Sequence, residues 1–241
     1  MISKEVKIVG GNYDRDGYLI LRNENLSKDI KCVREEFKLF HEKFDHDTFK
    51  NRNILKRFSD TFSVSNIFSN EIMDLILKKF INIKNPVFCG PIVSHYTSND
   101  STGSSYGLPF HQDYPSMASS KNSCIIWFCL EDCSSKNHSI SVIPCFHKNG
   151  LLPGDQNDGG YVLNLSDKQK KKEKILDIKA GDILIMSSFL PHKTYVNKKI
   201  SNFKLSFSRR IDDFENKDWA YRKFINAYKT SVDRELFRLS S

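Results

Sequence analysis

Hydrophobic residues recur with two different periods along the chain, and the period changes near Pro86. Before Pro86, apolar side chains return every three or four residues over 28–44 and again over 69–81, which predicts two amphipathic helices. Ser27 precedes the first of these segments and is its expected N-cap. The intervening residues 45–66 are polar and irregular, and we expect a loop there.

After Pro86 the apolar runs become short and are separated by turns rich in Gly, Pro, Asn and Asp, a pattern that predicts many short β-strands. One further short strand is expected ahead of the helices, at 18–21. The predicted strands of the second part are 87–97, 108–114, 124–130, 139–144, 161–165, 175–178, 182–186, 193–196 and 203–211. Strands of this kind are typical of a sandwich or barrel, so we expect a mainly β fold with flanking helices that cover a sheet.

No internal repeat or linker divides the sequence, and we expect a single domain over residues 1–241. The helical cover is expected at about 24–85 and the β core at about 86–212. A C-terminal helix is expected at about 217–238, where apolar side chains again return at helical spacing. A chain of this length can bury a sizeable core.

The composition is that of a soluble globular protein, with 39% hydrophobic and 27% charged residues. No apolar run reaches the ~18 residues that a membrane-spanning helix needs. The first residues show no signal peptide, and the six cysteines form no Cys-x-x-Cys pair. These features favour reduced thiols and a cytoplasmic protein.

The formal net charge is +8, and much of it lies in the lysine-rich segment 168–174. A basic protein can bind nucleic acid or anionic lipid, but a single charged run is more often a solvated loop. We therefore expect no nucleic-acid partner. An anionic small-molecule substrate would also suit this charge.

The strongest candidate chemistry lies at His111 and Asp113, near the end of a predicted strand. In an extended chain, residues two apart point to the same face, so these two side chains are expected on one side and Gln112 on the other. His192, which follows a later predicted strand, is the candidate third ligand. Two histidines and one carboxylate on one face of a metal, with open positions opposite, are typical of non-haem Fe(II) oxygenases.

These residues lie in a wider pattern, and the sequence resembles the phytanoyl-CoA dioxygenase family of Fe(II)/2-oxoglutarate-dependent oxygenases, particularly its small bacterial members. The resemblance extends over about residues 13–213. The matching stretches are 17–20, 108–114, 127–133, 142–153, 180–185 with Pro191-His192, and 204–210.

The resemblance implies a double-stranded β-helix, that is, a jelly-roll or cupin-like core, with Fe(II) at one open end. It implies His111, Asp113 and His192 as the iron ligands. It further implies 2-oxoglutarate as co-substrate, dioxygen as oxidant, and hydroxylation of a small molecule with release of succinate and CO2. Related halogenases lack the carboxylate, so Asp113 predicts oxidation rather than halogenation.

The chain departs from the family where an Arg usually begins the last strand, because Lys204 takes that place with one residue inserted after His192. Lys204 is expected to pair with the distal carboxylate of 2-oxoglutarate, as a point charge rather than a planar fork, with help from the Thr194 hydroxyl. Arg210 shares its strand face and is the alternative cation. Trp127 either lines the same pocket or fills the barrel.

Two interpretations stay open. His95, on an earlier predicted strand, either faces the pocket or belongs to the core. The departure at Lys204 also leaves room for a metal-binding jelly-roll protein or enzyme that does not use 2-oxoglutarate. A nucleic-acid or lipid-binding module would rest on net charge alone and would leave the two histidines and Asp113 unexplained.

Overall fold

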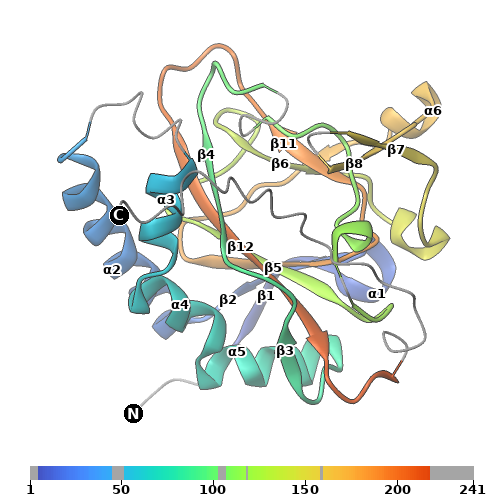
Figure 1. Ribbon diagram of the computed structural model, residues 1–241, viewed down its shortest axis with the longest axis horizontal. Helices are drawn as coiled ribbons and strands as arrows, with labels where there is room; N and C mark the ends of the chain where they lie inside the picture. Colours follow the sequence, from blue (N-terminus) through green and yellow to red (C-terminus); the bar gives the residue numbers. More distant parts are fainter. Residues whose placement is uncertain (1–4, 45–51, 103–106, 118, 158–159, 218–241) are drawn as a thin grey trace, which may run out of the picture.

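The structure of the chain is a computed structural model, and it describes residues 5–44, 52–102, 107–117, 119–157 and 160–217. Two antiparallel sheets form its centre, and helices cover one face of the larger sheet (Figure 1). The larger sheet contains, in spatial order, β1 (Lys7–Asn12), β2 (Tyr18–Arg22), β10 (Asp182–Ser187), β5 (Cys124–Cys129), β12 (Lys204–Asp213) and β3 (Pro86–Phe88), with β4 (Val93–Thr97) also paired to β12.

The second layer of strands is smaller and is joined through His111. It contains β11 (His192–Tyr195), β6 (Ser139–Val142) and β9 (Lys174–Ile175), and a separate ribbon of β7 (Gly154–Asn157) and β8 (Gly160–Leu163). The backbone of His111 makes isolated bridges to Val162 of β8 and to His192 of β11. This one residue therefore links the two-stranded ribbon to the three-stranded sheet.

The helical layer consists of α2 (Glu24–His41), α3 (Arg52–Ser59), α4 (Phe62–Ser69) and α5 (Glu71–Ile76), which continues into the π-helical turn η2 (Leu77–Ile81). Short helical turns occur elsewhere, namely α1 (Tyr13–Asp16), η3 (Tyr114–Ser116), η4 (Phe146–Asn149) and α6 (Asp167–Lys170). The expected mainly β architecture with flanking helices is confirmed. No described helix combines the length and the apolar character needed to cross a membrane.

The first helix begins earlier than predicted. Asn23 is its N-cap, and the Asn23 side-chain oxygen accepts hydrogen bonds from the backbone N–H groups of Asn25 and Leu26 at 3.0 and 3.1 Å. The predicted cap, Ser27, lies inside the helix, and its hydroxyl donates to the carbonyl oxygen of Gly181 at 2.9 Å. Ser27 thus ties the helix to the turn before β10 rather than starting it.

The loop predicted over 45–66 is wrong for most of its length, because α3 and the start of α4 lie there. Both helices are amphipathic. Leu55 and Phe58 of α3, and Val64 and Ile67 of α4, are buried in the core against the larger sheet. Among the polar residues of this segment, Lys56 and Arg57 of α3 and Asn66 of α4 lie on the exposed sides of these helices.

The long strand β12 organises both layers by simple alternation. Leu205, Phe207 and Ile211 point toward the helices and are fully buried in the core beneath them. Lys204, Ser206, Ser208 and Arg210 point to the other side, into a pocket between the sheets. Because side chains alternate along a strand, one ten-residue element both anchors the helical layer and lines the pocket.

Two predicted strands differ in the structure. The segment 87–97 forms two strands, β3 and β4, which both pair with β12 and are separated by Gly90 and Pro91. Pro91 has no N–H to donate to a ladder, which explains the break. The segment 108–114 is not a strand. Besides the bridges of His111, backbone hydrogen bonds of Leu108, Phe110 and Tyr114 to neighbouring segments hold it in place. The helix predicted at 217–238 lies almost wholly outside the described residues.

Candidate metal centre

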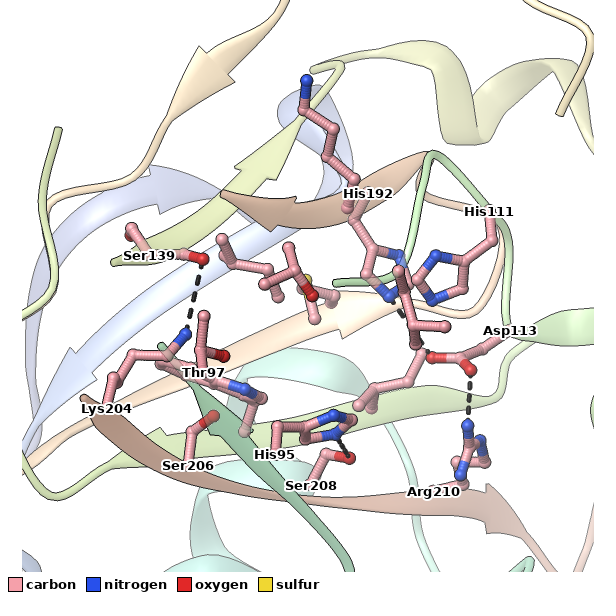
Figure 2. A pocket seen from close by; sticks show the side chains of 17 residues that line it. His95, Thr97, His111, Asp113, Ser139, His192, Lys204, Ser206, Ser208 and Arg210 are labelled. Atoms are coloured by element: carbon pink, nitrogen blue, oxygen red, sulfur yellow. Dashed lines mark hydrogen bonds and ion pairs between the residues drawn. The ribbon is translucent and has the colours of Figure 1, made fainter. Parts of the chain in front are cut away.

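Two imidazoles and one carboxylate converge at one end of the pocket between the sheets. One potential ligand atom from each of His111, Asp113 and His192 lies within 4.8 Å of the others (Figure 2). His192 Nε2 is 3.5 Å from Asp113 Oδ2, and the two imidazole rings are 4.2 Å apart between centroids. The three residues that sequence spacing singled out are therefore neighbours in space.

The local backbone differs from the extended strand that the alternation argument assumed. His111 is bridged to His192 by two backbone hydrogen bonds, of 2.9 and 3.1 Å. Asp113, in contrast, has helical backbone angles (φ −74°, ψ −25°) and immediately precedes the turn η3. The side chains of His111 and Asp113 meet because the chain turns after the bridge, not because the two residues share a flat strand.

Both histidines are fixed in the tautomer that suits a metal. Nδ1 of His111 lies 2.8 Å from the carbonyl oxygen of Pro109, and Nδ1 of His192 lies 2.9 Å from that of Leu190. A carbonyl oxygen only accepts hydrogen bonds, so each Nδ1 must carry the proton and each Nε2 keeps its lone pair. Burial lowers the pKa of His111 to about 4, which keeps this imidazole neutral and able to ligate.

Asp113 is held in its charged form by Arg210, whose Nη2 donates to Oδ1 at 2.6 Å. Burial alone would raise the pKa of Asp113, but the charge of Arg210 and the two nearby imidazoles outweigh it and lower the pKa below its usual range. Since Arg210 occupies Oδ1, Oδ2 is the oxygen that faces His192 and is directed at the candidate metal position.

Gln112 supports this arrangement from behind, on the side away from the ligands. Its amide nitrogen donates to the carbonyl oxygens of Gly150 and Phe189, and its amide oxygen accepts from the backbone N–H of Leu152 at 2.9 Å. Sequence alternation placed Gln112 on the opposite face from the ligands, but gave no sign that it ties together three backbone segments.

Lys204 lies at the opposite end of the pocket and is only 4% exposed. Its Nζ is 5.2 Å from the centre of the Trp127 ring and donates weakly to the carbonyl oxygen of Ser139 at 3.4 Å. Among the described residues it forms no ion pair with a carboxylate. A buried ammonium without a counter-ion is costly, so this end of the pocket is suited to an anionic ligand.

Hydroxyl groups surround the same end of the pocket. Thr97 and Ser206 are fully buried, and neither hydroxyl has a hydrogen-bond partner within the described part of the chain. Thr194 lines the pocket as well, from β11. Unsatisfied buried hydroxyls are unusual, and a bound carboxylate would supply acceptors for them. Sequence alternation places Ser206 on the same strand face as Lys204 and Arg210, whereas Thr97 had not been singled out, since an isolated hydroxyl carries no motif.

Several other residues, most of them predicted from the sequence, lie around the pocket. Trp127, on β5, forms part of its wall, and His95 also faces the pocket rather than the core (Figure 2). Arg210 lies at the Asp113 end, at the other end of its strand face from Lys204. Lys193 also lines the pocket, and its Nζ pairs with Glu173 at 2.8 Å.

Comparison with known proteins agrees with this geometry. A family model described as phytanoyl-CoA dioxygenase (PhyH) matches residues 13–199. "Phytanoyl-CoA dioxygenase 1" of Oryza sativa subsp. japonica is 24% identical over 204 residues, which are 82% of this chain and 66% of the rice protein. The chain thus spans slightly less than two thirds of that relative's length.

Solved structures with the same fold include the epimerase SnoN of nogalamycin biosynthesis, in complex with Fe3+, alpha ketoglutarate and nogalamycin RO (TM-score 0.58, 14% identity, 84% of this chain and 81% of that one). EvdO2 from Micromonospora carbonacea var. aurantiaca, complexed with 2-oxoglutarate, is also similar (TM-score 0.58, 11% identity, 91% of this chain and 100% of that one).

The two antiparallel sheets and the ligand set at one end define a double-stranded β-helix protein with a candidate mononuclear metal centre. The expected jelly-roll core is confirmed. The chain belongs to the phytanoyl-CoA dioxygenase family, because the family model matches most of its length.

Proposed function

We propose that this protein is an Fe(II)/2-oxoglutarate-dependent dioxygenase that hydroxylates a small molecule. The observation that carries the proposal is a single pocket with ligands for a metal at one end and a buried, unpaired lysine at the other. Such a pocket matches a molecule that chelates a metal with one end and presents a carboxylate at the other.

His111, Asp113 and His192 would hold Fe(II), through two neutral Nε2 atoms and one carboxylate oxygen. Lys204 would pair with the distal carboxylate of 2-oxoglutarate, with hydroxyls of Thr97, Ser206 and Thr194 around it. SnoN and EvdO2, which have the same fold, are solved with alpha ketoglutarate or 2-oxoglutarate bound. Arg210 is the weaker choice for the distal carboxylate, since it pairs with Asp113.

When bound, iron and 2-oxoglutarate supply the oxidising chemistry, in which dioxygen is consumed and 2-oxoglutarate becomes succinate and CO2. The chain's own contribution is geometric and electrostatic. Arg210 holds Asp113 charged and directed toward the metal position, and Gln112 fixes the backbone on which the ligands stand. The buried walls, including Trp127, exclude water from the reacting centre.

The charges that line the pocket do not themselves favour an anionic substrate. Lys193 is paired with Glu173, and Arg210 with Asp113, while Lys204 is assigned to the co-substrate. Basic residues that contribute to the net charge lie at the surface of the described chain, for example Lys168 and Lys170 of the exposed turn α6. We propose a small substrate that does not require a full negative charge.

The decisive experiment is anaerobic calorimetric titration of 2-oxoglutarate into the protein with and without Fe(II), followed by measurement of succinate in air. We expect binding that depends on iron, and slow succinate formation even without substrate. H192A should lose iron binding, while L39A, on an exposed helix position, is the matched control. Iron binding without any affinity for 2-oxoglutarate would refute the proposal.

That last result would favour the alternative, a jelly-roll metal protein that does not use 2-oxoglutarate. The alternative rests on one observation, Lys204 in the place where the family usually has Arg. If the protein instead binds 2-oxoglutarate and forms succinate, a screen of small molecules for stimulated succinate formation would identify its substrate class.

A further inference from the structure

One imidazole in the pocket is not accounted for by the metal ligands. His95 lies on β4, directly opposite Ser206 of β12 in the strand register. Its ring lies between Lys204 and Asp113 on the floor of the pocket (Figure 2). A ligand that spans from the metal to Lys204 must therefore pass over His95.

The two ring nitrogens of His95 have different surroundings. Nε2 lies 3.1 Å from the hydroxyl oxygen of Ser208, two residues further along β12. Nδ1 has no hydrogen-bond partner among the residues that the structure describes. Burial, reinforced by the charges of Lys204 and Arg210, lowers the pKa of His95 to about 3, so the ring is neutral and carries one N–H.

The chemistry of a carboxylate ligand decides which nitrogen carries that proton. Carboxylate oxygens only accept hydrogen bonds, so Nδ1 must be the donor toward the ligand. Nε2 is then the acceptor, and the hydroxyl of Ser208 donates to it. This proton arrangement is available to His95 and Ser208 with both groups neutral, because a hydroxyl rotates to donate.

We propose that His95 binds 2-oxoglutarate. His95 donates a hydrogen bond from Nδ1 to a carboxylate oxygen of the co-substrate, and Ser208 fixes the tautomer of the imidazole. The inference rests on the proposed function. A neutral donor fits here because Lys204 and Arg210 already supply positive charge at both ends of the pocket, and a third cation would add repulsion without a further counter-ion.

Three variants separate the roles of the two nitrogens. H95F keeps the approximate shape of the ring and removes both nitrogens. H95N places an amide nitrogen near the Nδ1 position and keeps a donor there. H95Q reaches the Nε2 position, keeps the contact with Ser208 and leaves no donor at Nδ1.

The measurement is anaerobic calorimetry of 2-oxoglutarate binding to the Fe(II)-loaded protein. H95F and H95Q should bind about 10-fold to 150-fold more weakly, as expected for one lost hydrogen bond to a charged group. H95N should stay within about 3-fold of the wild type, because its donor is retained. If H95F proves insoluble, H95Q and H95N carry the comparison alone.

Wild-type affinity in H95F or H95Q would overturn the inference, and so would an H95N that binds as weakly as H95Q. Iron stoichiometry and thermal unfolding of each variant show whether a loss is local. The two proposals fail differently. If the wild-type protein binds iron but no 2-oxoglutarate, the proposed function is wrong; if it binds 2-oxoglutarate and all variants match it, only the role of His95 is wrong.

Discussion

Replacing Lys204 by methionine tests whether this residue binds the co-substrate or stabilises the folded chain. The side chain is 4% exposed and pairs with no described carboxylate. A buried charge costs several kcal/mol in effective desolvation. Two contacts offset part of this desolvation cost. They are the contact of the ammonium with the Trp127 ring, worth about 2 kcal/mol when desolvated, and one long hydrogen bond to Ser139, at 3.4 Å.

Methionine is unbranched and of similar length, so K204M leaves no large cavity. We expect the free energy of unfolding of the metal-free protein to stay unchanged or to rise by up to about 2 kcal/mol, which follows from the balance of the desolvation and ring-contact contributions. Urea denaturation measures this quantity directly. In thermal unfolding, a rise of about 2 kcal/mol corresponds to an increase of about 4–8 °C in the melting temperature for a chain of this size.

The same variant should lose the co-substrate. Removing one partner of a buried, hydrogen-bonded charge pair costs about 2–5 kcal/mol, which is a loss of about 30-fold to 5,000-fold in affinity for 2-oxoglutarate. K204R is the matched control, because it keeps the charge and restores the usual family residue; its affinity should stay within about 10-fold of the wild type. A K204M protein that unfolds more easily yet binds 2-oxoglutarate normally would show that Lys204 is structural and refute the reasoning.

Three further predictions concern the surroundings of the site. R210M should weaken iron binding about 10-fold to 100-fold, as expected for loss of a residue that orients a ligand; metal titration checks it, and unchanged affinity would show that Asp113 needs no partner. Q112L should lower the unfolding free energy by about 3 kcal/mol, because three buried backbone groups lose a partner; urea denaturation tests it, and a loss below about 1 kcal/mol, the value of a single hydrogen bond, would contradict it. Burial raises the pKa of Glu131 to about 7, so the free energy of unfolding of the wild type should fall as the pH rises from about 4.5, the pKa in the unfolded chain, through 7. E131Q should reduce this fall by up to about 3 kcal/mol, and parallel pH profiles of the two proteins would refute the assignment.

The convergence of His111, Asp113 and His192 could be predicted from sequence because their chemistry is rare and their spacing matches a known family. The physical argument behind the prediction was only partly right. His111 and Asp113 meet through a bridge followed by a helical turn, and not through strand alternation. The family pattern predicted that the three residues converge, whereas local geometry alone assumed a strand that does not form.

The sequence was informative wherever a clear period existed. The alternation of Lys204, Ser206, Ser208 and Arg210 with apolar residues predicted that these four share a face, and all four line the pocket. The helices α3 and α4 were not predicted because the polar residues of the segment 45–66 indicated a loop and obscured the helical spacing of its apolar residues. The spacing of Leu55 with Phe58 would have predicted an amphipathic helix in that segment.

The partners of Lys204 could not have been found in the same way. Thr97 becomes its cross-strand neighbour only because β4 pairs with β12 in one particular register. Hydroxyl residues are common, and nothing in the sequence distinguishes a hydroxyl that lines a pocket from one on the surface. The pairing of two strands distant in sequence is a property of the folded chain.

That register also connects the fold to the proposed function. A slip of β12 by one residue would exchange its two faces, so that Lys204 and Ser206 would enter the apolar layer beneath the helices while Leu205 and Phe207 entered the pocket. Burying the charge without partners and exposing two aromatic or aliphatic side chains to a polar cavity would each cost several kcal/mol. The polar face of β12, whose Lys204 forms no ion pair with a described carboxylate, therefore helps to specify the one register in which it can bind a ligand.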